Sequence, residues 1–227
     1  MTDQPLQLTP RGWTADPEAR RRLSRRAQLL AGASVTYNVI EAVIAITAGL
    51  VAGSVALVGF GLDSVVEVSS GLIILWQFRH RLPETRERQA LRLLAFSFFG
   101  LAAYVTFESV RALIGGSDPE TSPVGISLAI ASLIVMPVLS WAQRRTGKAL
   151  GSNAVVADGT QTLLCTYLSA VLLAGLVLNA TLGWGWADPI AGLVIAAVAV
   201  REGVQAWRGE GCCAPANGPG CTDGCCN

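Results

Sequence analysis

Two acidic residues stand inside an apolar stretch, where a membrane chain would rarely place them. Asp63 and Glu67 are four residues apart in the run GFGLDSVVEVSS. On a helix this spacing puts both side chains on one face, about 6 Å apart along the axis. Carboxylates this close repel each other, and a shared proton or a bound cation relieves the repulsion. The pair predicts a cation site; the structural alternative is that protonated side chains hydrogen-bond to neighbouring helices.

A second pair of polar residues repeats the four-residue spacing. Gln161 and Cys165 occur in the run AVVADGTQTLLCTYLSA. A thiolate favours zinc, cadmium and similar ions over magnesium and calcium, whereas an amide oxygen is a weak ligand. Cys165 also suits a small apolar packing position. Asp158, one turn earlier, either gates or feeds the site, or interacts with a helix dipole.

A third polar group precedes the carboxylate pair along the chain. Glu41, with Asn38 nearby, is placed at a similar depth in the preceding apolar stretch. These side chains are candidates for lining the path or carrying protons. Near the other end of a later apolar stretch, Glu108 and Arg111 are three residues apart and predict a local ion pair.

The elements that position these residues are membrane-spanning helices. The 227 residues are 52% hydrophobic and only 15% charged, unlike an ordinary soluble domain. A span needs about 20 apolar residues. The sequence predicts an all-α membrane protein with six spans, at 29–52, 55–78, 93–113, 124–142, 154–178 and 186–204.

Basic residues predict how the spans are oriented. Arginines crowd the segment 1–28 and the connection 79–92, and residues 144–148 carry two arginines and a lysine. Loops rich in Lys and Arg stay in the cytoplasm, so we expect both termini there, in a multi-pass protein of the cytoplasmic membrane. Residues 29–207 would form the transmembrane domain.

The chain ends in a segment rich in Gly, Pro and Cys, for which we expect flexibility. Residues 208–227 form this tail, predicted on the reducing side, where stable disulfides are rare. Clustered thiolates suit soft metals, although a tail with no bound metal is the alternative. The candidate ligands are Cys212, Cys213, Cys221, Cys225 and Cys226.

Three stretches resemble the cation diffusion facilitator family, whose members exchange zinc and related dications for protons through six helices as homodimers. They are GSVALVGFGLDSVVEVSS, SNAVVADGTQTLLCTYLS and WADPIAGLVIAAVAVREG. The resemblance places the family's four metal ligands at Asp63, Glu67, Gln161 and Cys165. The second pair departs from the family's usual His and Asp. Because only a short tail follows the last predicted span, the chain resembles a branch of the family that lacks the usual soluble domain. This branch is similar to the vertebrate synaptic-vesicle zinc-efflux membrane protein.

These observations predict a transporter that exports divalent cations such as zinc or cadmium by proton antiport. The expected partners are metal cations, protons, lipid and a second copy of the chain, with no nucleic acid and no cofactor besides the transported ion. With one His and no nucleotide-binding loop, we expect no enzymatic activity. The alternative function is a non-transporting membrane metal sensor or assembly partner.

Overall fold

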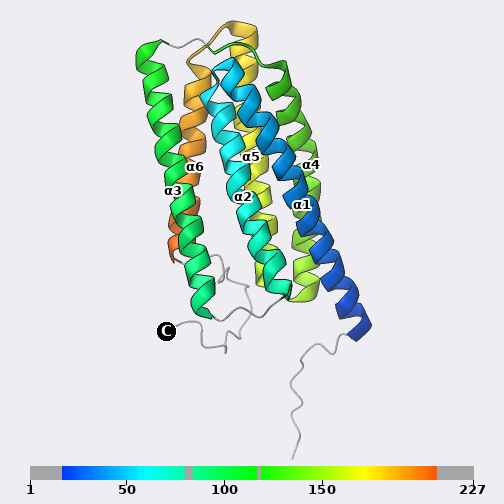
Figure 1. The fold of residues 1–227 in the computed structure, drawn as a ribbon. Helices are drawn as coiled ribbons and strands as arrows, with labels where there is room; N and C mark the ends of the chain where they lie inside the picture. Colours follow the sequence, from blue (N-terminus) through cyan, green and yellow to red (C-terminus); the bar gives the residue numbers. More distant parts are fainter. Residues whose placement is uncertain (1–16, 80–83, 117–118, 209–227) are drawn as a thin grey trace, which may run out of the picture.

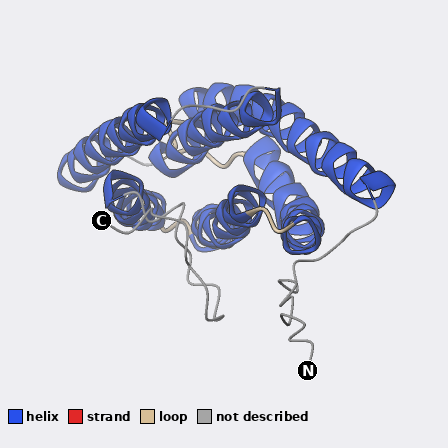
Figure 2. Cartoon of the chain, turned by 90° about the horizontal axis from the view of Figure 1, so that it is seen from below, coloured by secondary structure: helices blue, strands red, loops and turns tan. Residues whose placement is uncertain are grey.

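The protein is a bundle of long helices (Figure 1). The computed structural model describes residues 17–79, 84–116 and 119–208, which contain no strand (Figure 2). All six helices contain a window long and apolar enough to cross a membrane, which confirms the predicted fold class. The helices are α1 (Pro17–Ala52), α2 (Val55–Arg79), α3 (Glu84–Gly115), α4 (Pro123–Leu150), α5 (Asn153–Leu182) and α6 (Ala187–Arg208).

Several helices are longer than the apolar spans that the sequence predicts. The first helix begins at Pro17 rather than at residue 29, the third at Glu84 rather than at residue 93, and the fourth continues to Leu150. Charged residues are good helix formers, so a helix continues past the apolar stretch that marks the membrane. Apolar length alone therefore underestimates these helices.

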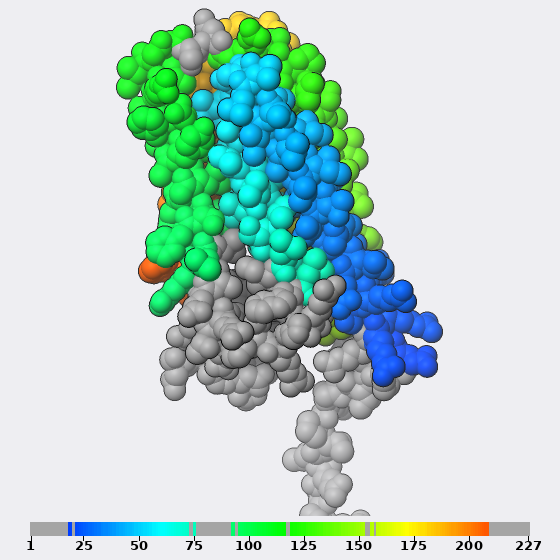
Figure 3. Space-filling model, in the orientation of Figure 1, coloured from blue at the N-terminus to red at the C-terminus, as the bar shows by residue number. Residues whose placement is uncertain are grey.

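Helix α2 occupies the centre of the bundle. It contacts α1, α3, α5 and α6. Within its spanning window 61% of the residues are buried, against at most 39% in any other helix. Figure 3 shows α2 between α1 and α3 on one face of the molecule. Ser64, Glu67 and Ser70 of α2 are thus enclosed by protein.

The hairpin of α1 and α2 depends on three glycines. Gly53 forms the turn with a φ of 65°, a left-handed conformation that glycine adopts without strain. A Cβ on Gly49 would lie 2.8 Å from the backbone nitrogen of Val58, and one on Gly61 would lie 3.0 Å from that of Ile46. At these glycines the backbones of α1 and α2 pack directly against each other, with no room for a side chain between them.

The hairpin of α4 and α5 repeats this construction. Gly151 forms its turn with a φ of 67°. A Cβ on Gly147 would lie 2.8 Å from the nitrogen of Val156, and one on Gly159 would lie 3.0 Å from that of Arg144. The same number of positions separates Gly53 from Gly151, Gly49 from Gly147 and Gly61 from Gly159. We call residues related by this separation counterparts. The sequences also agree, with GSVALVGFG in the first hairpin and GSNAVVADG in the second.

The two repeated hairpins run through the bundle in opposite directions. The α1–α2 turn lies at the upper end of the bundle in Figure 1, and the α4–α5 turn lies at the lower end. Hydrogen bonds repeat as well: Ser54 N donates to Gly49 O at 2.9 Å, and Ser152 N donates to Gly147 O at 3.0 Å. The fold therefore contains an inverted repeat, a feature of many secondary transporters.

The buried carboxylate of Asp188 links the start of α6 to the start of α2. Asp188, at the start of α6, accepts hydrogen bonds from Ser54 Oγ at 2.5 Å, Val55 N at 2.9 Å and Ala56 N at 3.4 Å. The first backbone N–H groups of a helix have no partner within it, so Asp188 satisfies donors at the start of α2. The Asp-Pro sequence that begins α6 thus has a structural role.

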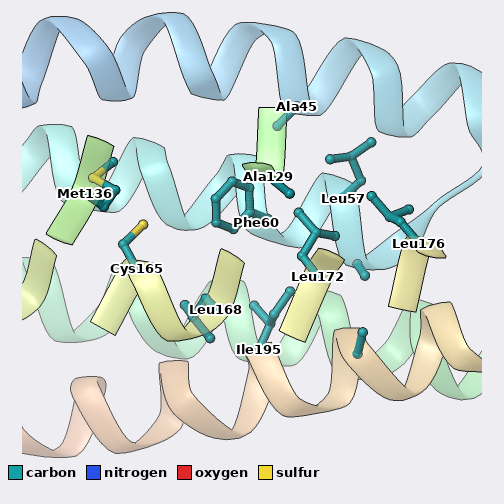
Figure 4. Packing of buried hydrophobic residues seen from close by; sticks show 12 residues of the cluster. Ala45, Leu57, Phe60, Ala129, Met136, Cys165, Leu168, Leu172, Leu176 and Ile195 are labelled. Atoms are coloured by element: carbon teal, nitrogen blue, oxygen red, sulfur yellow. The ribbon is translucent and has the colours of Figure 1, made fainter. Parts of the chain in front are cut away.

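The apolar core surrounds the central part of α2. Phe60 is fully buried and packs with side chains of α1, α4, α5 and α6 (Figure 4). Large apolar side chains on the outside of the bundle are exposed, among them Val51, Ile114 and Val138. In a bilayer these side chains would contact lipid, whose hydrocarbon core is as apolar as they are.

Candidate metal pocket

The predicted ligands surround one pocket between α2, α3, α5 and α6. The pocket is partly open, and its empty space, counted together with the solvent at its opening, is about 250 Å³. Asp63 and Glu67 reach it from α2, and Gln161 and Cys165 reach it from α5. Asp63 is eight residues from the start of α2, so it lies about 12 Å along the helix, near the middle of a hydrocarbon layer about 30 Å thick.

The walls between these polar groups are apolar. Phe98 of α3, Leu164 and Leu168 of α5, and Val198 of α6 line the pocket. Apolar walls exclude water and lower the local dielectric constant, which strengthens any attraction between a carboxylate and a cation. The pocket therefore combines acidic groups with apolar walls.

Glu67 and Cys165 form the most buried part of the pocket. The Glu67 residue is 4% exposed and Cys165 is 2% exposed. The carboxyl group lies next to the thiol and close to the Thr162 side chain. Its Oε1 atom nevertheless has no hydrogen-bond partner. A buried oxygen without a partner is costly, and a ligand would relieve that cost.

The pocket is not a closed metal cluster. Within the described ranges, no three His, Cys, Asp or Glu side chains converge closely enough to hold an ion. Asp63 and Gln161 are partly exposed, while their partners one turn away are buried. Ion binding would therefore require these side chains to rotate toward one another.

The inverted repeat relates the two halves of the pocket. Asp63 and Gln161 are separated by the same number of positions as the paired glycines of the two hairpins, and so are Glu67 and Cys165. These residues are therefore counterparts in the repeat. Supporting hydrogen bonds match: Ser64 Oγ donates to Phe60 O, and Thr162 Oγ1 donates to Asp158 O, both at 3.1 Å. The repeat thus brings the two pairs with four-residue spacing to one pocket, and both acidic residues belong to the α2 pair.

Glu41 and Asn38 belong to a separate buried polar group between α1 and α2. Both are 1% exposed. Ser64 Oγ donates to Glu41 Oε2 at 3.0 Å. Glu41 Oε1 and both side-chain polar atoms of Asn38 lack partners. Because Ser64 follows Asp63 directly, this group adjoins the pocket through α2.

Asp158 lies outside the pocket lining, one turn nearer the start of α5. It is 5% exposed and accepts a hydrogen bond from Gln143 Nε2 of α4 at 2.7 Å. In the repeat, Asp158 and Gln143 are the counterparts of Phe60 and Ala45. The α4–α5 hairpin therefore carries a polar pair at the position where the α1–α2 hairpin carries an apolar pair.

Comparison with known families is consistent with this geometry. The family described as "Cation efflux transmembrane domain" matches residues 93–208, half of the chain. The chain belongs to the cation efflux, or cation diffusion facilitator, family. The predicted resemblance is therefore confirmed, and the chain is a multi-pass membrane protein.

This cation efflux protein has relatives in bacteria and vertebrates. It is 26% identical over 153 residues to an uncharacterized transporter of Synechocystis, and 24% identical over 193 residues to transmembrane protein 163 of Xenopus laevis. It is 27% identical over 190 residues to the cation-efflux pump FieF of Shewanella oneidensis. These matches cover 63%, 83% and 79% of the chain, and 49%, 69% and 63% of the relatives. The chain thus spans about half the length of the Synechocystis protein.

Sequence reasoning missed one acidic residue of the pocket as well as its apolar walls. Glu202 lines it from α6. It directly follows Arg201 near the end of the last apolar stretch, so it appears in the sequence as part of a charged flank. Only the position of α6 against α2 reveals that it lies within the bundle. The tail cysteines named above, Cys212 to Cys226, lie outside the described residues.

Proposed function

We propose that this cation efflux protein carries divalent metal cations across the membrane through the α2–α5 pocket. The observation that carries the proposal is the gathering of Asp63, Glu67, Gln161 and Cys165 around one pocket within the spanning segments of α2 and α5. A dication offsets the repulsion between two carboxylates and is held more strongly where water is excluded. The Cys165 thiol favours zinc, cadmium or a similar ion.

Exchange for protons follows from the ligand chemistry. Carboxylates and a thiol must lose their protons to bind a metal, so each binding event releases protons. Metal affinity should therefore fall as pH falls. Glu41, through its hydrogen bond to Ser64, is proposed to accept or pass on protons beside the pocket.

The inverted hairpins provide a means of alternating access. Rocking one repeat against the other exposes a fixed central site first to one side and then to the other. The paired Asp158 and Gln143 would form the polar approach on the α4–α5 side. Arginine-rich connections support a cytoplasmic position for that side, from which transport would run as efflux. A homodimer joined through helix faces is the proposed assembly.

The test is ion flux into proteoliposomes. We expect radioactive zinc or cadmium to move with the wild-type chain and to move faster with a pH gradient. Asp63→Ala and Glu67→Ala should abolish flux, whereas Glu120→Gln, a change at an exposed residue of the α3–α4 connection, should preserve it. Flux that survives both alanine substitutions would overturn the pocket as the path. Metal binding without any flux in the wild type would instead favour the sensor function.

A further inference from the structure

We propose that Glu202 of α6 is a third carboxylate ligand of the transported cation and sets which dications the pocket accepts. This inference rests on the transport function proposed above. It assigns a role to a helix that supplies none of the four predicted ligands.

Glu202 lines the same pocket as the α2 carboxylates, Asp63 and Glu67. Its charge lies close enough to Asp63 for the two carboxyl groups to interact. The Oε1 atom of Glu202 is buried and has no hydrogen-bond partner.

Glu202 belongs to no ion pair among the described residues, although the charge of its neighbour Arg201 acts on it. The ion pairs recorded there are Glu18 with Arg22 and Glu108 with Arg111. The neighbouring Arg201 side chain is exposed on the helix surface. Glu202 is partly buried. Charged residues inside a membrane bundle are costly and usually serve a function.

A second buried carboxylate oxygen lies in the same pocket. Glu67 Oε1 also lacks a hydrogen-bond partner, and the Glu67 residue is only 4% exposed. Two unpartnered oxygens from separate helices thus belong to side chains that line one space. A cation drawn into this pocket would offer both oxygens a partner once the side chains rotate toward it.

Glu202 compensates for the charge that α5 does not supply. The repeat places Gln161 and Cys165 opposite Asp63 and Glu67, so the α5 half offers a neutral amide and a thiol. A carboxylate from α6 restores a third acidic group. Oxygen ligands then outnumber the single sulfur, which suits borderline and harder ions such as manganese(II) better than a site dominated by sulfur would.

The experiment compares binding of two dications of different softness to the full chain in detergent. Manganese(II) and cadmium(II) are titrated against the wild type, Glu202→Gln, Glu202→Asp and the exposed control Glu120→Gln. We expect Glu202→Gln to weaken manganese binding by about tenfold or more, the scale of losing a metal-site partner. Cadmium binding should change much less, and Glu202→Asp should recover part of the manganese affinity.

Other results separate this inference from the proposed function. If Asp63→Asn abolishes binding of both ions but Glu202→Gln changes neither, the pocket stands and the role of Glu202 is wrong. An equal loss of both ions in Glu202→Gln also overturns the selectivity role. If only the pH dependence of flux changes, Glu202 carries protons rather than metal, which contradicts the inference. Failure of the wild type to bind either ion overturns both proposals.

Discussion

The Cys165 thiol lies next to the Glu67 carboxyl group, although the two residues belong to different repeats. They are counterparts in hairpins that cross the bundle in opposite directions. A soft sulfur and a hard oxygen therefore meet at the most buried point of the pocket. If the pocket carries the ion as proposed, the choice of ion would depend on both helices.

Replacing the sulfur should change selectivity more than transport itself. In Cys165→Ser, a hydroxyl takes the place of the thiol, and cadmium loses its soft ligand. We expect cadmium affinity to fall by about tenfold or more while zinc affinity falls less. Competition between cadmium and zinc for uptake by proteoliposomes measures the ratio. An unchanged ratio would show that Cys165 packs as an apolar residue only.

Close packing in the two hairpins predicts matched effects of added methyl groups. Gly61→Ala would place a Cβ 2.7 Å from Ile46 Cγ1, and Gly159→Ala would place one 2.7 Å from Arg144 Cγ. Backbone atoms lie almost as near, so the helices must separate, at a cost of about 1 to 3 kcal/mol. Thermal unfolding in detergent should show a lower Tm for both.

The control for this pair is a glycine with free space around it. A Cβ on Gly100 would meet nothing within 4 Å. Gly100→Ala should leave stability unchanged or raise it, because alanine loses less backbone entropy in a helix. A decrease in Tm equal to that of Gly61→Ala would show that the hairpin contacts are not responsible.

The sequence predicts the spans, the short α1–α2 turn and the two polar pairs with four-residue spacing because each depends on local pattern. Apolar length marks a span, and a four-residue spacing marks one helix face. The position of Glu202 in the pocket could not be predicted, because it depends on how α6 packs against α2. The same holds for Asp188, whose partners Ser54 and Val55 are far away in the chain.

Asp188 should matter for stability and not for metal binding. Asp188→Asn removes the negative charge that accepts hydrogen bonds at the start of α2, and charged hydrogen bonds contribute about 1.5 to 3 kcal/mol. We expect a lower Tm in detergent with unchanged zinc affinity. Weaker zinc binding without a change in Tm would contradict the structural role and place Asp188 on the ion path.

The orientation of the bundle can be tested at the two opposite ends of the repeat. In a chain whose six native cysteines are replaced by Ser, Glu120→Cys and Lys148→Cys each introduce one exposed thiol. Glu120 lies in the α3–α4 connection, and Lys148 lies in the last turn of α4. Because basic loops stay in the cytoplasm, a membrane-impermeant maleimide should label intact cells at position 120 only. Position 148 should react after the membrane is permeabilised. The reverse pattern would invert the bundle and turn the proposed polar approach at Asp158 toward the outside, so that the same pocket would load from there.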